Sequence, residues 1–248
     1  MAAKRKKKLV RVESDPTSPA SEPTWKPTPE AKAKANRNRI IAVLLWLVAI
    51  GIEVGTIFWV LKQDEINMAL LIGAIVLIGV LSIIGSLLWK KANQADPARR
   101  SDPVRFFLKN QLGAILAVVA FLPLIVMIIK NANLEGNQKK IATGIAAVAA
   151  IVAALFGTSF NSPSVEQYTE ETARVIELTG DDIVYWTKSG EVYHLCADVS
   201  AVNLESEDNT IYSGTVGEAH AAGKERLTLQ VDMELEQCGF DPIDEAEE

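Results

Sequence analysis

The sequence predicts an all-α membrane domain of four transmembrane helices, followed by a small α+β tail domain and preceded by a disordered basic arm. Apolar residues are 49% of the 248 residues, yet they gather in uncharged runs in the middle of the chain. Charge is also segregated, with a net charge of +7 over residues 1–39, +4 over 40–160 and −17 over 161–248. This pattern excludes an ordinary soluble enzyme. The 2 cysteines exclude a disulfide-dense secreted domain.

Residues 1–39 are basic and rich in proline, which predicts a stiff, disordered spacer. The cluster Lys4–Lys8 can bind anionic lipid headgroups, at about 1 kcal/mol per charge, or serve only to set the topology. We expect no nucleic-acid binding, because no aromatic or folded platform accompanies these charges. Apolar sequence begins only at Ile40, so we expect no cleavable signal peptide and a first helix that stays as an anchor.

Four apolar runs in the middle of the chain are long enough to cross a bilayer. A hydrocarbon core of about 30 Å needs roughly 20 apolar residues in helical form, because unpaired peptide groups are not tolerated there. None of the runs keeps the polar stripe of a buried helix in a soluble protein. The predicted spans are residues 40–61, 66–89, 112–129 and 141–160.

Lys and Arg counts in the flanks predict the orientation in the plasma membrane. The N-terminal flank has 11, the turn at 62–65 has 1, the loop at 90–109 has 6 and the loop at 130–140 has 3. We therefore expect a cytoplasmic N-terminus and, after four crossings, a cytoplasmic tail. An outside tail would require one run to enter and return, and the third run, which contains Pro123, is the candidate.

Glu53 is the one ionisable residue inside a predicted span. A charged carboxylate at that depth is costly, so Glu53 must be neutral, paired or hydrated. It could belong to a proton or cation path, or be a structural carboxyl that faces a neighbouring helix. The other spans offer only small hydroxyls to extend a path, which favours the structural role.

Small residues on three of the spans predict close helix packing, because they let helix backbones approach each other in lipid. Glu53 lies about 200° around the helix from Gly51, so the carboxyl and the glycines should face different neighbours. We expect some of these surfaces to contact other integral membrane subunits; the alternative is that packing within the chain uses them all. The candidate packing residues are Gly51, Gly55, Ser82, Ser86, Gly144, Ala150 and Gly157.

Residues 161–240 predict a juxtamembrane helix and a small α+β domain. Residues 165–176 are amphipathic, after which the apolar period changes to two. Residues 241–248 read as a solvated acidic tail. The expected elements are strands at 182–188 and 191–196 joined by a turn, a third strand at 210–216, a helical turn at 217–223 and a fourth strand at 226–235.

All histidines and cysteines of the chain lie in this tail, at His194, Cys196, His220 and Cys238. Their number suits a tetrahedral zinc site, although the spacing matches no zinc finger or ribbon. The cysteines could instead form a disulfide if the tail is outside the cell, or be buried apolar residues if it is inside. We expect no catalytic site and no other cofactor, because no catalytic or phosphate-binding motif is present.

The tail also resembles a known kind of domain. The matching segments are 184–190 (VYWTKSG), 192–195 (VYHL), 213–216 (SGTV) and 218–224 (EAHAAGK). They resemble a small C-terminal domain of uncharacterised actinobacterial multi-pass membrane proteins. The whole layout is similar to that of accessory subunits of the actinobacterial respiratory supercomplex, which joins cytochrome bcc to the terminal oxidase. This resemblance implies a place in the electron transport chain.

The sequence thus favours a non-catalytic accessory subunit that stabilises a larger membrane complex. Two alternatives remain at this point. One is a small transporter or channel that uses Glu53, and the other is a metal or redox sensor that uses the His and Cys residues of the tail.

Overall fold

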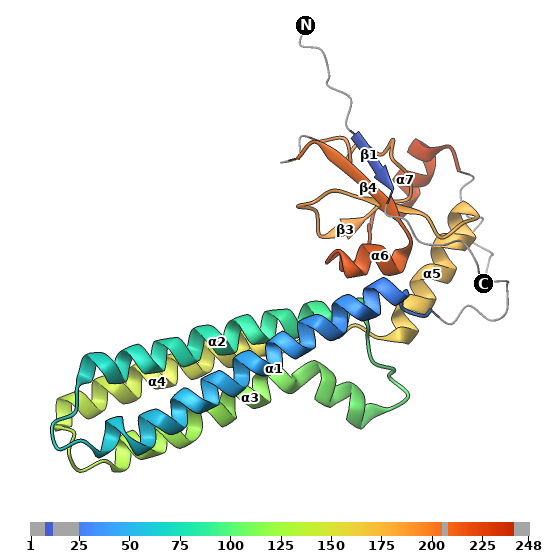
Figure 1. Ribbon diagram of the computed structural model, residues 1–248. Coiled ribbons are helices and arrows are strands. Elements are labelled where there is room, and N and C mark those ends of the chain that lie inside the picture. Colours follow the sequence, from blue (N-terminus) through green and yellow to red (C-terminus); the bar gives the residue numbers. More distant parts are fainter. Residues whose placement is uncertain (1–7, 12–24, 205–207, 241–248) are drawn as a thin grey trace, which may run out of the picture. The chain divides into compact units, whose positions relative to one another are not determined.

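The computed structural model describes residues 8–11, 25–204 and 208–240 and is mostly helical (Figure 1). It divides into two compact units. The membrane unit contains residues 34–93 and 101–162. The tail unit combines three separate segments, Met1–Ala33, Gln94–Arg100 and Pro163–Glu248.

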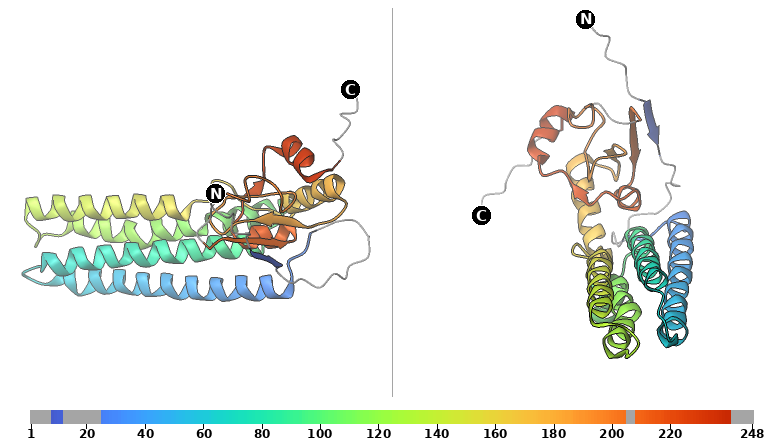
Figure 2. Two further views of the ribbon diagram at one scale, coloured as in Figure 1. Left: turned by 90° about the horizontal axis from the view of Figure 1, so that it is seen from above. Right: turned by 90° about the vertical axis from the view of Figure 1, so that its left-hand side faces the viewer.

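The membrane unit consists of four helices that are long and apolar enough to span a bilayer, which confirms the predicted membrane domain. Each helix includes its predicted span or nearly all of it, and most extend beyond it. Figure 2 shows the four helices side by side when viewed along their length. Their bounds are α1 Pro29–Phe58, followed by the 3₁₀ turn η1 Val60–Lys62, α2 Met68–Ala95, α3 Pro103–Lys130 and α4 Gly136–Gly157.

Helix α3 begins nine residues before its predicted apolar run, because its first turn is well formed. Asp102 accepts the backbone N–H of Arg105 at 3.1 Å, and Pro103 stands at the first helical position. Both features favour helix initiation. The helix continues through Pro123 to Lys130, so residues 103–130 form one continuous helix and not an entering and returning pair.

Side chains from all four helices form the core of the membrane unit. Phe121, Leu71 and Leu124 are fully buried in it. Asn131 and Asn133 donate to the backbone oxygens of Leu61 and Gln63, at 2.6 and 3.0 Å, which joins the turn after α1 to the turn after α3.

Two close approaches explain why small residues occur inside this unit. A Cβ atom on Gly157 would lie 2.4 Å from the backbone of Gly113 and Ala114, so α4 touches α3 main chain to main chain. A Cβ atom on Gly85 would lie 2.6 Å from the indole nitrogen of Trp46, which donates to the backbone oxygen of Ser82 at 3.3 Å. Packing at this distance replaces the hydrophobic drive that lipid removes.

The tail unit begins with helix α5 (Val165–Thr179), which confirms the predicted juxtamembrane helix. Ser164 caps its N-terminus by accepting the N–H of Gln167, and Gly180 ends it with a φ of 86°. A positive φ at this position favours glycine. Strands β2 (Val184–Trp186) and β4 (Thr210–Gly214) pair antiparallel, and helix α6 (Val216–Ala221) follows β4.

The predicted hairpin is present in shortened form. The backbone groups of Tyr185 and His194 exchange two hydrogen bonds, at 2.8 and 2.7 Å. Strand β3 (Val192–Tyr193), however, pairs in parallel with β5 (Arg226–Leu227). Because of this second pairing, the tail contains two small sheets.

The predicted fourth strand is wrong beyond residue 227. Residues Val231–Cys238 form helix α7, which ends at Gly239 with a φ of 74°. Val231 and Leu235 are buried, whereas Met233 is 44% and Leu229 is 78% exposed. Apolar residues at 231, 235 and 238 also fit the spacing of a helix. Burial of that face decides in favour of the helical period over the strand period of two.

The predicted disordered arm is also wrong in part. Residues Lys8–Arg11 form strand β1, which pairs in parallel with β4, so the larger sheet has the order β1-β4-β2. Helix α1 begins at Pro29, well before Ile40. The cluster Lys4–Lys8, except for Lys8, and the acidic residues 241–248 lie outside the described residues.

We predict that Gly157→Ala destabilises the membrane unit by about 1–3 kcal/mol, because the new methyl group must push α3 and α4 apart. Gly73→Ala is the matched control, since a Cβ there meets nothing within 4 Å. Thermal unfolding of the full chain in mild detergent measures the difference. Equal melting temperatures for the two variants would contradict the close packing of α4 on α3.

Candidate functional site

The predicted packing residues separate into an internal and an external group. Ser82 and Ser86 are 1% exposed, and Gly157 is buried against α3, so these three pack within the chain. Ala150 lies at the edge of the helix core. A Cβ on the remaining three, Gly51, Gly55 and Gly144, would meet nothing within 4 Å, so these glycines face outward.

The outward face of α1 is apolar, and two glycines leave its middle without side chains. Leu47 is 59% and Phe58 is 63% exposed, and Gly51 and Gly55 lie on this face between them. Glu53 is 3% exposed and points into the unit. The carboxyl and the glycines therefore lie on different faces of α1, and a neighbour for the glycine face stays a prediction.

Glu53 faces the backbone of α3 at Leu124, and its Oε1 atom has no hydrogen-bond partner. The nearby hydroxyl of Thr56 donates to the backbone oxygen of Ile52, and Ser86 donates to that of Ser82. These hydroxyls satisfy their own helices and do not extend a polar path from the carboxyl. This arrangement fits a structural carboxyl, and transport through Glu53 stays a prediction.

The tail unit contains a buried polar network centred on Glu171 of α5. Glu171 accepts from Tyr193 at 2.5 Å, from the His220 ring at 2.7 Å and from Gln167 at 2.8 Å. The Nδ1 atom of His220 lies 2.8 Å from the backbone oxygen of Lys224. Because a carbonyl can only accept, Nδ1 carries the proton of this hydrogen bond.

The charge of this network follows from its contacts. Burial by itself raises the pKa of Glu171, but hydrogen bonds from His220, Tyr193 and Gln167 and the charge of His220 outweigh it and lower the pKa. Burial and the nearby Glu171 raise the pKa of Tyr168 and Tyr193. The two phenols therefore stay neutral donors at physiological pH.

Aromatic rings enclose His220 and connect the separate segments of the tail unit. The Tyr168 ring stacks on His220 with 3.8 Å between centroids, and Trp25 meets Tyr168 edge-on at 5.0 Å. The Tyr168 hydroxyl donates to the backbone oxygen of Gln94 at 3.0 Å. The backbone N–H of Trp25 donates to the hydroxyl of Thr169 at 3.0 Å. Tyr168 and Thr169 thus connect α5 to residues 94–100 and to the N-terminal segment that contains Trp25.

Lys224 is a second buried charge, only 3% exposed. Its ammonium group donates to the backbone oxygens of Thr187 at 2.7 Å, Lys188 at 3.2 Å and Gly190. Burial lowers its pKa. Lys224 therefore replaces water as the donor to the turn between β2 and β3.

The four residues predicted as zinc ligands do not come together in this structure. Cys196 and Cys238 form a disulfide, His194 lies 2.7 Å from Glu234, and His220 lies 2.7 Å from Glu171. Among the residues the structure describes, no group of three or more His, Cys, Asp and Glu could hold a metal ion. Zinc binds thiolates, so a zinc site stays a prediction for the reduced chain.

The disulfide belongs to a larger attachment of helix α7. Glu234 is 2% exposed, and its two oxygens contact the His194 ring at 2.7 Å and the Leu195 N–H at 3.0 Å. Two residues after His194, Cys196 is bonded to Cys238. In the sequence, Glu234 would stand out as an acidic residue on an apolar helix face. It can be recognised in this way only when residues 231–238 are known to form a helix.

The central side chains of the tail network hydrogen-bond within the unit. Both oxygens of Glu171 and both ring nitrogens of His220 already have partners inside the unit. The sequence analysis missed Glu171, Lys224 and Tyr168 as members of this network. Their separation along the chain conceals it, since Glu171 and His220 are 49 residues apart.

Comparisons of the chain with family models, with curated proteins and with solved structures find no match. The resemblance to actinobacterial membrane proteins therefore stays a prediction.

We predict that Asp182 makes the tail unit less stable as the pH rises. Burial and the charges of Glu218 and Asp181 raise its pKa to about 6, despite a hydrogen bond from the Val216 N–H. The stability from its neutral form is complete below about pH 4 and is lost as the pH rises through 6. Asp182→Asn should remove this loss and stabilise the unit at pH 7 by about 1–3 kcal/mol.

Hydrogen exchange of the α6 peptides in the full chain, between pH 5 and 8, measures this effect. The exposed residue Asp198 provides the control variant Asp198→Asn, which should follow the unsubstituted chain. The same pH dependence in Asp182→Asn and in the control would contradict the burial of an ionising Asp182.

Proposed function

We propose that this chain is a non-catalytic integral membrane subunit that packs against, and stabilises, a larger membrane complex. The observation that carries the proposal is the outward position of Gly51 and Gly55 on α1, where a Cβ would meet nothing. The internal glycines Gly85 and Gly157 show what such residues do in this chain, because each receives a close neighbour.

The physical argument depends on what drives association in lipid. Apolar side chains gain nothing by leaving hydrocarbon for each other, so helices associate through close backbone packing. A Gly-x-x-x-Gly pair on an outward face costs helix propensity, about 1 kcal/mol for each glycine relative to alanine. A partner helix that packs in the groove offsets this cost. The buried charged groups Glu171, Lys224 and Glu234 have partners inside the chain, which favours a structural role for them.

The proposed host is a respiratory supercomplex of the actinobacterial type. This part of the proposal rests on the similarity of layout to accessory subunits, with a basic N-terminal segment, four helices and an acidic tail. The chain would lie in the plasma membrane and contribute no cofactor of its own.

The composition of the tail unit supports an even number of membrane crossings. Helices α1 and α2 connect the N-terminal segment to residues 94–100, and α3 and α4 connect residues 94–100 to the segment that begins at 163. The described parts of all three segments share one unit, in which β1 pairs with β4 and Ala98 accepts the Val165 N–H. With one crossing per helix, the N-terminal segment, the 94–100 loop and the tail lie on one side. The Lys and Arg counts favour the cytoplasmic side.

We predict that mild-detergent purification brings down stoichiometric partner subunits, and that Gly51→Leu with Gly55→Leu abolishes their recovery because the leucines fill the groove. The matched control is Gly73→Leu, another outward glycine with open space around it. Quantitative mass spectrometry of the purified complex measures recovery. A monodisperse chain without partners, or equal recovery in both variants, would refute the proposal.

The second candidate function, redox sensing by Cys196 and Cys238, has one observation in its favour. The two cysteines form a disulfide in the unit that the Lys and Arg counts assign to the cytoplasm. Disulfides in that compartment are rare and usually transient. A sensor would form the bond when oxidised and release α7 from residue 196 when a cellular dithiol reduces it.

Alkylation of intact cells with membrane-permeant and impermeant maleimides, before and after oxidant treatment, tests this candidate. A sensor predicts free thiols in unstressed cells that only the permeant reagent reaches, and loss of labelling after oxidation. Cys196→Ser with Cys238→Ser is the unlabelled control. A permanent disulfide, labelled by the impermeant reagent only after impermeant reductant, would refute sensing and place the tail outside.

A further inference from the structure

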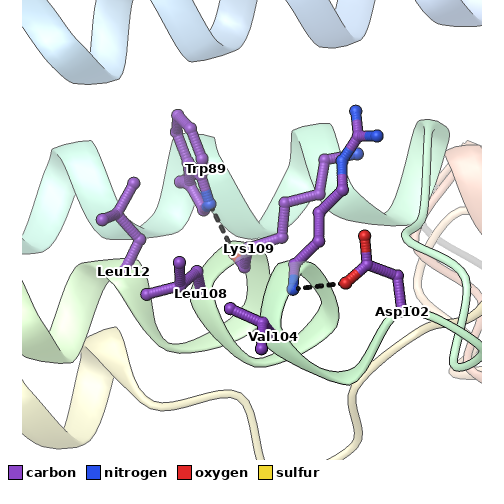
Figure 3. Close-up of a pocket in the computed structure, with 7 residues that line it drawn as sticks. Trp89, Asp102, Val104, Leu108, Lys109 and Leu112 are labelled. Carbon is purple, nitrogen blue, oxygen red and sulfur yellow. Dashed lines mark hydrogen bonds between the residues drawn. The ribbon is translucent and has the colours of Figure 1, made fainter.

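An apolar hollow lies between α2 and α3 of the membrane unit. Its apolar lining consists of Trp89 from α2 and Val104, Leu108 and Leu112 from successive turns of α3 (Figure 3). Its volume is about 400 Å³, which is in the range of pockets for single small ligands. Asp102, Arg105 and Lys109 complete the lining.

The position of the hollow along the helices places it at the boundary between hydrocarbon and headgroups. Trp89 is the last residue of the second apolar run and is followed by Lys90 and Lys91. Leu112 is the first residue of the third run. Tryptophan and flanking lysines are typical of the membrane interface, so the hollow opens where a lipid has both an acyl chain and a phosphate.

Hydrogen bonds hold Trp89 at the wall of the hollow. Its indole nitrogen donates to the backbone oxygen of Lys109 at 2.7 Å, and Asn93 donates to the same oxygen at 2.7 Å. Trp46 also contacts the Trp89 ring, with 5.5 Å between centroids. The apolar wall is therefore preformed.

The charges around the hollow are mainly positive. Arg105 and Lys109 are four residues apart and therefore share one face of α3. The lining thus carries two cationic side chains and one carboxylate, that of Asp102. Asp102 accepts the backbone N–H of Arg105. Among the described residues, the Arg105 side chain forms no ion pair.

We propose that this hollow binds an anionic phospholipid, with an acyl chain against Leu108 and Leu112 and the phosphate at Arg105 and Lys109. The apolar lining disfavours a soluble anion, which would leave that surface uncovered. The surplus of positive charge disfavours a zwitterionic lipid. Basic pockets beside transmembrane helices are suited to anionic headgroups. The site is independent of any partner subunit and distinct from the cluster Lys4–Lys8.

Lipid titration of the full chain, delipidated in mild detergent, tests this site by native mass spectrometry. Phosphatidylglycerol should bind more tightly than phosphatidylcholine of the same chain length. Arg105→Gln with Lys109→Gln should weaken phosphatidylglycerol binding about tenfold or more, at the usual value per charge. The matched control, Lys139→Gln with Lys140→Gln in the first turn of α4, should leave the affinity unchanged. Equal affinities for the two lipids, or equal losses in both double variants, would overturn the proposal.

A crosslinking experiment on the unsubstituted chain keeps the test independent of folding of the variants. Phosphatidylglycerol with a diazirine in its acyl chain should label peptides that contain residues 104–112. Unlabelled phosphatidylglycerol should compete with it, and phosphatidylcholine should not. Labelling confined to other helices, or competition by glycerol phosphate alone, would show that the hollow is not an anionic lipid site.

Discussion

The membrane unit depends on one constraint, which is that peptide groups in hydrocarbon must bond within their own segment. This constraint makes the four apolar runs helical whatever their detailed sequence. It also removes the hydrophobic drive between helices, so that their association depends on close packing. Contacts such as Gly157 on the α3 backbone and Trp46 on Gly85 are therefore as important here as large apolar side chains are in a soluble core.

The tail unit is governed by a different requirement, since it buries charged side chains. Glu171 and Glu234 each contact two groups that are distant in sequence, and Lys224 donates to backbone oxygens that are distant in sequence. An isolated buried charge is unfavourable, whereas one with several donors or acceptors is tolerated and fixes its neighbours. These networks hold the elements of residues 163–248 together, and the contacts of Trp25 and Tyr168 attach the other two segments.

The two units together indicate where function resides. In the described part of the tail unit, Glu171, Lys224 and Glu234 have partners inside that unit, and the Oε1 atom of the buried Glu53 has no hydrogen-bond partner. What remains available is surface, namely the glycine face of α1 and the hollow beside Trp89. We propose that the first surface takes a helix of a partner subunit and the second an anionic lipid. The disulfide adds a chemical question of its own, because a bond of this kind is unexpected in the compartment that the basic flanks favour.

By itself, the sequence determined the four spanning helices, the juxtamembrane helix, the hairpin around residue 190 and the opposite faces of Glu53 and Gly51. Each of these follows from local periodicity or from the cost of charge in lipid. Only the tertiary structure decided that 231–238 is a helix, that Lys8–Arg11 joins β4 and that Cys196 pairs with Cys238. The pattern of 226–235 fits both periods, and burial of one face selects the helix. The strand pairing and the disulfide join residues about 200 and 42 positions apart, and no local pattern records which distant segment supplies the partner.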